Sequence, residues 1–139
     1  MTGVQTCALP IYSDLGWEVY PEGLTRTLVW VKERYGDIPL YVTENGMALP
    51  EPATLAASSF NDPRRVDYLR RHVLAVRTAM DAGVDVRGYF VWSLLDNFEW
   101  SCGRSKRFGI VHVDQETQRR TLKSSALFYR DLIRNRGSL

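Results

Sequence analysis

Residues 39–46 read PLYVTENG, a short apolar run of good β-formers that ends in a carboxylate, an amide and a glycine. A second run of this kind, RGYFVWSLL, occupies residues 87–95. Neither run alternates cleanly between apolar and polar residues, as a strand with one solvated face does. The pattern therefore predicts strands that are buried on both faces, as in a parallel sheet covered by helices.

Helical periodicity flanks both runs. The first helix is expected after residues 20–23, YPEG, where apolar residues follow at spacings of four, three and four, and Gly36 suits its end. The second helix is expected from Asp62 and Pro63, which suit the N-cap and the first turn. Its apolar residues are spaced by three and four, and Gly83 ends it.

A third helix is expected from near Thr121, with Leu122, Ala126, Tyr129 and Ile133 on its apolar face. Helices and strands then alternate in the order α, β, α, β, α, which places the chain in the α/β class. Two strands make neither a closed nor a well-covered parallel sheet. The elements therefore indicate a part of a larger fold.

The composition narrows the possible functions. The 139 residues are 45% apolar and 24% charged, which is ordinary globular composition. No apolar run approaches the roughly 18 residues that a membrane span needs, and the net charge of +2 is too small to favour a nucleic-acid partner. Cys7 and Cys102 have no disulfide or zinc spacing, so we expect a reducing, cytoplasmic location.

Residues 1–11, MTGVQTCALPI, carry no charge, no clear period and no helix cap. The stretch is too short for a secretory signal and lacks its basic start. It resembles the translation of a DNA-sequencing adapter, so we interpret it as a non-native head and assign the domain to residues 12–139. A genuine disordered N-terminus is the alternative. If the head is non-native, upstream sequence is missing.

Glu44 directly follows the first apolar run and is a candidate catalytic residue. Functional groups collect at the C-terminal ends of parallel strands, and a carboxylate there can act as a nucleophile or a base. The alternatives are a hairpin turn at Asn45 and Gly46, or a carboxylate that is merely solvated. Residues 47–61 read as a long surface loop and a poor returning strand, which disfavours the hairpin.

Residues 92–100, WSLLDNFEW, form a second candidate cluster. They follow the second strand and would lie at the same sheet edge as Glu44. Aromatic faces beside carboxylates suit sugars, whose C–H faces pack on rings while their hydroxyls bond to oxygens. The alternative is an aromatic core anchor in which Asp96 and Asn97 bond the loop backbone. Nearby basic residues raise single-stranded nucleic acid as a third reading, which the acidic residues of the cluster oppose.

Two histidines carry weaker signals. His72 lies within the second helix and is expected at a surface or interface, whereas His112 lies in a short extended segment and is expected to be structural. Cys102 is a lone thiol without a motif. The sequence contains no phosphate-binding glycine loop, nucleophile elbow or metal motif.

Three long motifs make the sequence recognisable. Residues 41–46, YVTENG, residues 88–100, GYFVWSLLDNFEW, and residues 105–114, SKRFGIVHVD, resemble glycoside hydrolase family 1, the β-glucosidases. The DPRR of residues 62–65 is similar as well, and the resemblance covers about residues 15–135. It implies a (β/α)₈ TIM barrel, of which this chain resembles the C-terminal portion: the last two βα units and the helix before them.

The resemblance implies retaining hydrolysis of β-glycosides by two carboxyl groups. The family nucleophile corresponds to Glu44, and the aromatic platform under the sugar corresponds to Trp92. The pair that bonds the outer hydroxyls corresponds to Glu99 and Trp100, and the aromatic near the 6-position corresponds to Phe108. Because a carboxylate at Glu99 repels phosphate, we expect an unphosphorylated β-glucoside or a short β-linked oligosaccharide. The mechanism implies no cofactor and no metal.

The acid/base glutamate of the family lies in an Asn-Glu-Pro motif, which this sequence lacks. Glu51 precedes a proline but follows Pro50, so it is a decoy. General acid catalysis is typically worth about 10²–10⁴-fold, so we expect the chain to be inactive alone, without the N-terminal part of the barrel. The alternative is a non-catalytic half-barrel that binds carbohydrate, although its exposed strand edges would favour aggregation.

Overall fold

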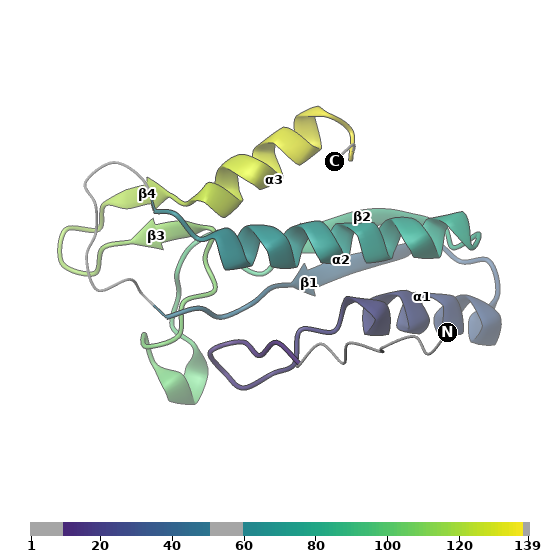
Figure 1. Ribbon diagram of the computed structural model, residues 1–139, viewed down its shortest axis with the longest axis horizontal. Helices are drawn as coiled ribbons and strands as arrows, with labels where there is room; N and C mark the ends of the chain where they lie inside the picture. Colours follow the sequence, from purple (N-terminus) through teal and green to yellow (C-terminus); the bar gives the residue numbers. More distant parts are fainter. Residues whose placement is uncertain (1–9, 51–59, 138–139) are drawn as a thin grey trace, which may run out of the picture.

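The computed structural model describes residues 10–50 and 60–137 (Figure 1). The proposed head at residues 1–11 falls almost wholly on residues 1–9, outside the described residues, as does Glu51. In chain order the elements are α1 (Pro21–Tyr35), β1 (Leu40–Asn45), α2 (Pro63–Asp81), β2 (Val86–Val91), the 3₁₀ turn η1 (Trp100–Cys102), β3 (Val111–Val113), β4 (Arg120–Leu122) and α3 (Ser124–Arg134). The α/β class expected from the sequence is confirmed.

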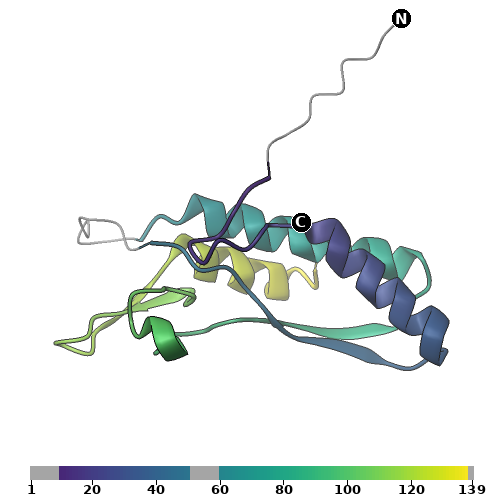
Figure 2. The ribbon, with the colours of Figure 1, turned by 90° about the horizontal axis from the view of Figure 1, so that it is seen from below.

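Strands β1 and β2 pair in parallel, and all three helices lie on one side of the pair (Figure 2). Leu28 of α1 and Val76 of α2 pack against Val42 of β1 and Val86 of β2, all of them buried. The hairpin turn considered at Asn45 and Gly46 is therefore absent, because a two-residue hairpin joins antiparallel strands and β1 pairs with β2 in parallel. No described helix is long and apolar enough to cross a membrane.

The other face of the β1–β2 pair is open. Tyr41 and Phe90, one from each strand, are both 54% exposed. The expectation of strands buried on both faces is therefore wrong for this chain. The physical reason is that only one layer of described helices covers the pair, so the outer side chains lack packing partners. We call this surface the open face.

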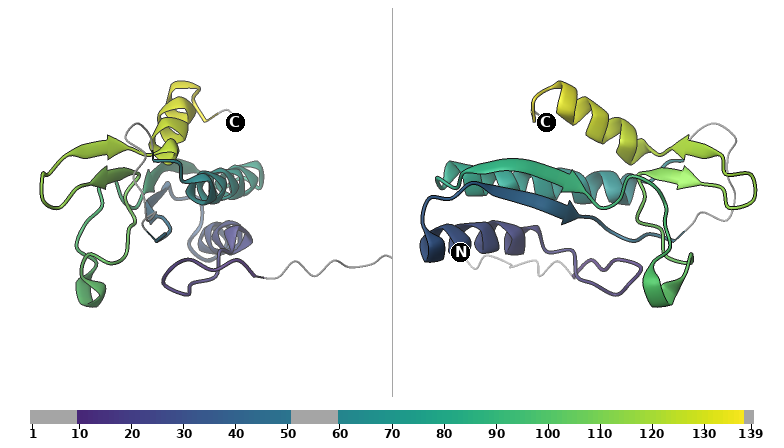
Figure 3. Two further views of the ribbon diagram at one scale, coloured as in Figure 1. Left: turned by 60° about the vertical axis from the view of Figure 1, so that its left-hand side comes forward. Right: turned by 180° about the vertical axis from the view of Figure 1, so that it is seen from behind.

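A second core joins α2, α3 and the antiparallel β3–β4 hairpin, which lies beyond the C-terminal ends of β1 and β2 (Figure 3). Leu69 of α2 and Ala126 of α3 are buried there. Ile110, which precedes β3, is buried with them, as are Met47 and Leu49. The start of the expected surface loop is therefore buried. Its backbone is held as well, because the Leu49 N–H donates to the Arg107 carbonyl at 3.0 Å.

Helix α3 begins at Ser124, later than the expected start near Thr121. Thr121 instead pairs with His112 in the hairpin, and Leu122 ends β4. The expected apolar face is also partly wrong, since Ile133 is 61% exposed. Pairing with β3 occupies the backbone of residues 120–122, so the helix starts only after it.

His72 is buried in α2, so of the two expected positions, a surface or an interface, the surface is wrong. Its ring stacks on Tyr68 at a centroid distance of 3.8 Å, and its Nδ1 lies 2.8 Å from the Tyr68 carbonyl oxygen. Burial is the main cause that lowers the pKa of His72. His112 is also buried, as a structural residue would be, and its ring stacks on Phe60.

Candidate active site

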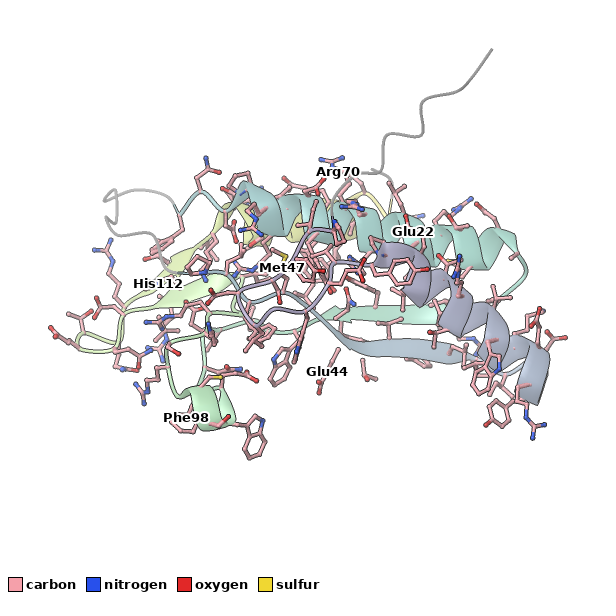
Figure 4. The ribbon with its side chains drawn as sticks, turned by 60° about the horizontal axis from the view of Figure 1, so that its bottom comes forward. Glu22, Glu44, Met47, Arg70, Phe98 and His112 are labelled. Atoms are coloured by element: carbon pink, nitrogen blue, oxygen red, sulfur yellow. The ribbon has the colours of Figure 1, made fainter. Side chains whose placement is uncertain are left out.

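Glu44 reaches the open face through an irregularity in β1. Val42 pairs with Tyr89 and Asn45 with Val91, so three steps along β1 match two along β2. Val42 and Tyr89 pack on the helix side, and the extra residue lets both Thr43 and Glu44 lie exposed. Figure 4 shows Glu44 near the end of β1, below the strands and away from the helices.

Trp92 follows the last residue of β2 and lies beside the end of β1. Its N–H donates to the Asn45 carbonyl at 3.0 Å. Because Val91 packs against the second core and side chains alternate along a strand, Trp92 belongs to the open face, where it is 37% exposed. The Trp92–Ser93 peptide bond is cis. The structure thus brings Trp92 and Glu44 to one edge of the strand pair.

Gly46 is required by the close approach of the two strand ends. A Cβ atom at Gly46 would lie 1.6 Å from the Trp92 carbonyl oxygen. No other residue fits at this distance, because both contacting groups belong to the backbone. The Asn-Gly dipeptide therefore marks a close backbone contact between the ends of β1 and β2, and not a turn.

Asn45 is held from the helix side of the pair. Its Oδ1 accepts a hydrogen bond of 2.7 Å from the Tyr89 hydroxyl, and the Tyr129 hydroxyl of α3 donates to the Tyr89 carbonyl at 2.8 Å. Burial raises the pKa of Tyr89, so the hydroxyl stays a donor at neutral pH. The residue next to Glu44 is thereby tied to β2 and α3.

The segment of residues 92–100 is a loop bonded to β3 rather than a continuation of β2. The Ser93 carbonyl accepts from the Ile110 N–H at 2.9 Å, and the Asp96 N–H donates to the Val111 carbonyl at 3.0 Å. The Asp96 carboxylate accepts from the Gly109 N–H at 3.0 Å, so it does bond backbone as the alternative reading held. We call residues 92–100 the aromatic loop.

Glu99 and Trp100 lie at the outer end of the aromatic loop, where η1 begins. The Glu99 N–H donates to the Gly103 carbonyl at 2.6 Å, and Trp100 is 84% exposed. Figure 4 shows the neighbouring Phe98 on the same side of the molecule as Glu44. Within the described part of the chain, no hydrogen bond links Glu99 to Glu44.

Phe108 differs from the other candidates because it is buried. It is 3% exposed, and its ring lies 6.3 Å from that of Trp17 at an angle of 50°. Its ring presents no open face to a ligand in this structure. The assignment of Phe108 to a sugar contact stays a prediction.

Two cavities of the described residues have linings that do not include Glu44. One of about 240 Å³ is lined by both apolar and charged residues, Asp62, Arg65 and Lys123 among them. Another, an apolar groove of about 640 Å³, runs along β2 and α3 past Phe90 and Ile133. No group of His, Cys, Asp or Glu among the described residues is arranged to hold a metal ion.

Comparison with known proteins identifies the family. The model for glycosyl hydrolase family 1 matches residues 6–138. The chain belongs to this family. A bifunctional β-D-glucosidase/β-D-fucosidase from Bifidobacterium breve is 50% identical over 125 residues, which are 88% of this chain and 27% of that protein. β-Glucosidase A from Thermotoga maritima is 46% identical over 123 residues, again 88% of this chain and 27% of the relative.

Solved family 1 structures match the fold as well. The family 1 β-glucosidase from Thermotoga maritima in complex with isofagomine lactam superposes with a TM-score of 0.89 and 43% identity, over 95% of this chain and 30% of that chain. This chain therefore spans about a quarter to a third of the length of its family 1 relatives. Its fold is consistent with a part of the family's barrel, and the assignment to the last two βα units stays a prediction.

Proposed function

We propose that this family 1 chain is the C-terminal part of a retaining β-glucosidase and that Glu44 is the nucleophile. The observation that carries the proposal is the extra residue in β1, which turns Glu44 onto the open face beside Trp92. Bulges of this kind re-aim side chains and are frequent next to active sites. The fold alone would not identify the function, since barrels of this kind catalyse many different reactions.

In the proposed reaction, a Glu44 oxygen attacks the anomeric carbon and the glycosidic bond breaks. The departing oxygen takes a proton from a second carboxyl group, and the sugar stays attached to Glu44 as an ester. Water, deprotonated by that second carboxylate, then attacks the same carbon and releases Glu44. Retaining enzymes hold the two carboxyl groups about 5–5.5 Å apart. We assign the second carboxyl group to a part of the barrel outside this chain, because the sequence lacks an Asn-Glu-Pro motif.

We propose a terminal β-D-glucosyl residue without phosphate as the group transferred. Trp92 would offer an apolar face to the sugar ring, and Glu99 and Trp100 would bond its outer hydroxyls. The partly exposed rings of Trp92 and Trp100 favour this role. The relatives from Bifidobacterium breve and Thermotoga maritima are named for β-glucosides, which supports the same class.

Complementation tests the proposal. The chain is co-expressed with the N-terminal portion of Thermotoga maritima β-glucosidase A that it does not match, and the product is called the assembled enzyme. We expect hydrolysis of 4-nitrophenyl β-D-glucoside by the assembled enzyme and a rate at least about 10²-fold lower for the chain alone.

Two variants of the assembled enzyme assign the nucleophile. Glu44→Ala should abolish hydrolysis, and added azide should restore turnover of a glucoside with a reactive leaving group. The product should be the α-glucosyl azide, because azide then attacks once without the second inversion. Glu22→Gln removes an exposed carboxylate of α1, which lies on the other side of the strands from Glu44 in Figure 4, and should leave the rate unchanged. Full activity of Glu44→Ala would overturn the proposal.

The same preparation tests the carbohydrate-binding alternative. If the chain alone is a soluble monomer, unfolds cooperatively and binds glucosides, the binding module is the better description. Exposed apolar side chains on the open face, such as Tyr41 and Phe90, favour assembly with further barrel strands instead.

A further inference from the structure

A buried ion pair lies beneath the aromatic loop. The Lys123 ammonium donates to Asp96 Oδ1 at 2.9 Å and to the Gly109 carbonyl at 2.7 Å. The two side chains are 4% and 0% exposed. A charge buried this deeply is costly unless a partner and hydrogen bonds compensate it, so each of the two residues depends on the other.

The pair joins three segments that are distant in sequence. Asp96 comes from the aromatic loop, Gly109 precedes β3, and Lys123 lies between β4 and α3. The Lys123 N–H also donates to the Ile110 carbonyl at 3.0 Å. A Cβ at Gly109 would lie 2.2 Å from the Asp96 nitrogen, so the two backbones touch. The position of Asp96 is therefore fixed from both neighbouring segments.

Other charged and polar groups face the pair. Asp96 Oδ2 lies 3.4 Å from His112 Nδ1, and the Phe60 ring lies 5.9 Å from the Lys123 ammonium. Burial and, after it, nearby Arg65 lower the pKa of Lys123, while Asp96 raises it. Asp96, by its charge and its hydrogen bond, and Asp62, by its charge, both favour the charged form of Lys123.

The aromatic loop depends on this anchor at its middle. Asp96 lies four residues after Trp92 and three before Glu99, and the outer end of the loop is open, with Trp100 at 84% exposure. We propose that Lys123 is a positioning residue for sugar binding, which acts by holding Asp96 and with it Trp92, Glu99 and Trp100. This inference rests on the proposed function of the loop.

The substitution Lys123→Met in the assembled enzyme tests the proposal. Misplacement of binding groups by about 1 Å can cost about 10²-fold, and we expect KM for 4-nitrophenyl β-D-glucoside to rise about tenfold, with a smaller change in kcat. The dissociation constant of deoxynojirimycin should rise in parallel. A purely structural loss would instead lower the active fraction and hence the apparent kcat, with KM unchanged.

Lys32 offers a control with similar bonds but an exposed ion pair, at the opposite end of the strands. Its ammonium also bridges an aspartate, Asp37, and a backbone carbonyl, that of Gly83 at 2.8 Å. Lys32→Met should leave KM and the deoxynojirimycin affinity unchanged. A KM shift equal to that of Lys123→Met would overturn the proposal, as would an unchanged KM in Lys123→Met.

If Lys123→Met does not fold, Asp96→Asn serves in its place, because the amide oxygen still accepts from Lys123 and Gly109 while the charge is gone. It should raise KM several-fold, and a wild-type KM in this variant overturns the proposal. Should the unsubstituted assembled enzyme hydrolyse no glycoside, the proposed function fails. Amide hydrogen exchange of residues 93–100 then still tests the anchor: faster exchange in Asp96→Asn than in Lys32→Met supports it, and equal exchange overturns it.

Discussion

The carboxylate of Asp62, at the N-cap position of α2, accepts hydrogen bonds from the N–H of Ser125 at 2.8 Å and from its hydroxyl at 2.6 Å. Ser125 lies in the first turn of α3, where backbone N–H groups lack partners within the helix. Asp62 therefore caps a helix distant in sequence and makes no side-chain cap for its own helix. The same carboxylate pairs with the buried guanidinium of Arg65.

Removal of this carboxylate should destabilise the protein strongly. Asp62→Ala takes away the cap of α3, worth about 1 kcal/mol, and leaves the Arg65 charge buried without its partner, worth about 3–5 kcal/mol when a buried pair is broken. We expect the urea midpoint of the assembled enzyme to fall clearly. Asp67→Ala is the control, because Asp67 is exposed and its pair with Arg71 spans 3.9 Å, so its change should stay under about 1 kcal/mol.

Gly46→Ala should separate the ends of β1 and β2. The methyl group would lie 1.6 Å from the Trp92 carbonyl oxygen, and overpacking typically costs about 1–3 kcal/mol and occasionally more. Stability and hydrolysis by the assembled enzyme should fall together, since Glu44 and Trp92 flank the contact. Gly36→Ala is the control. Gly36 has φ +85° and a Cβ there would meet no atom within 4 Å, so this variant adds backbone strain without a clash. A Gly46→Ala variant as stable as Gly36→Ala would contradict the expected clash.

Trp100→Ala should weaken sugar binding without unfolding the protein. The residue is 84% exposed, so it contributes little packing, and surface substitutions usually change stability by about 0.5 kcal/mol or less. Loss of a ring contact of about 1 kcal/mol corresponds to a KM increase of about fivefold. Trp30→Ala on α1, where the ring is 54% exposed, is the control and should leave KM unchanged. Steady-state kinetics of the assembled enzyme with urea titrations separate the two effects.

Stability should depend on pH through His72. Burial is the largest of the causes that lower the pKa of His72, followed by the opposing hydrogen bond to the Tyr68 carbonyl, the lowering charge of Arg71 and the raising charge of Glu22. The folded state keeps His72 neutral, whereas the unfolded chain takes up a proton below pH 6.5. The stabilisation is therefore present above pH 6.5 and is lost as the pH falls below it.

Urea midpoints at pH 7.5, 6.5 and 5.5 measure this dependence. Between pH 7.5 and 5.5 the decrease in unfolding free energy should be smaller for His72→Gln than for the unsubstituted protein. His112→Gln provides a comparison at the other histidine of the sequence. Equal pH dependence of His72→Gln and the unsubstituted protein would show that His72 does not bind the extra proton on unfolding.

Local sequence signals predicted the elements whose causes are local. The spacing of apolar residues and Gly36 predicted α1 and its end, although the helix begins at Pro21, within the stretch that was expected to precede it. The start of α3 was missed because pairing of Thr121 with His112 depends on the hairpin and not on the helix periodicity. Asp62 looked like a cap for the helix that follows it, yet its carboxylate points to Ser125. Contacts between distant segments decided the start of α3 and the partner of Asp62, which the sequence missed.

In the candidate site, too, features with local causes were predicted and features that depend on distant segments were not. The position of Glu44 at a strand end followed from the sequence, whereas the extra residue that turns it to the open face did not, because register depends on β2. Lys123 gave no signal at all. A lysine before a helix ordinarily reads as a solvated charge, and only the fold shows that Asp96 and Gly109 enclose it. The proposed sugar contacts of Glu99, Trp100 and Phe108 stay predictions.

The parallel pairing of β1 and β2 also constrains the order in which the chain can fold. Leu40 meets Val86 only after α2 has been synthesised between them, so β1 lacks β2 as a partner while the ribosome is still making the helix. Ser124 then closes back on Phe60, whose carbonyl accepts its N–H at 2.8 Å. Contacts between such remote positions slow folding, because a long segment must be ordered before any contact forms. Until β2 has been synthesised, the edge of β1 that β2 covers stays unpaired, and unpaired strand edges make partly folded chains prone to aggregate.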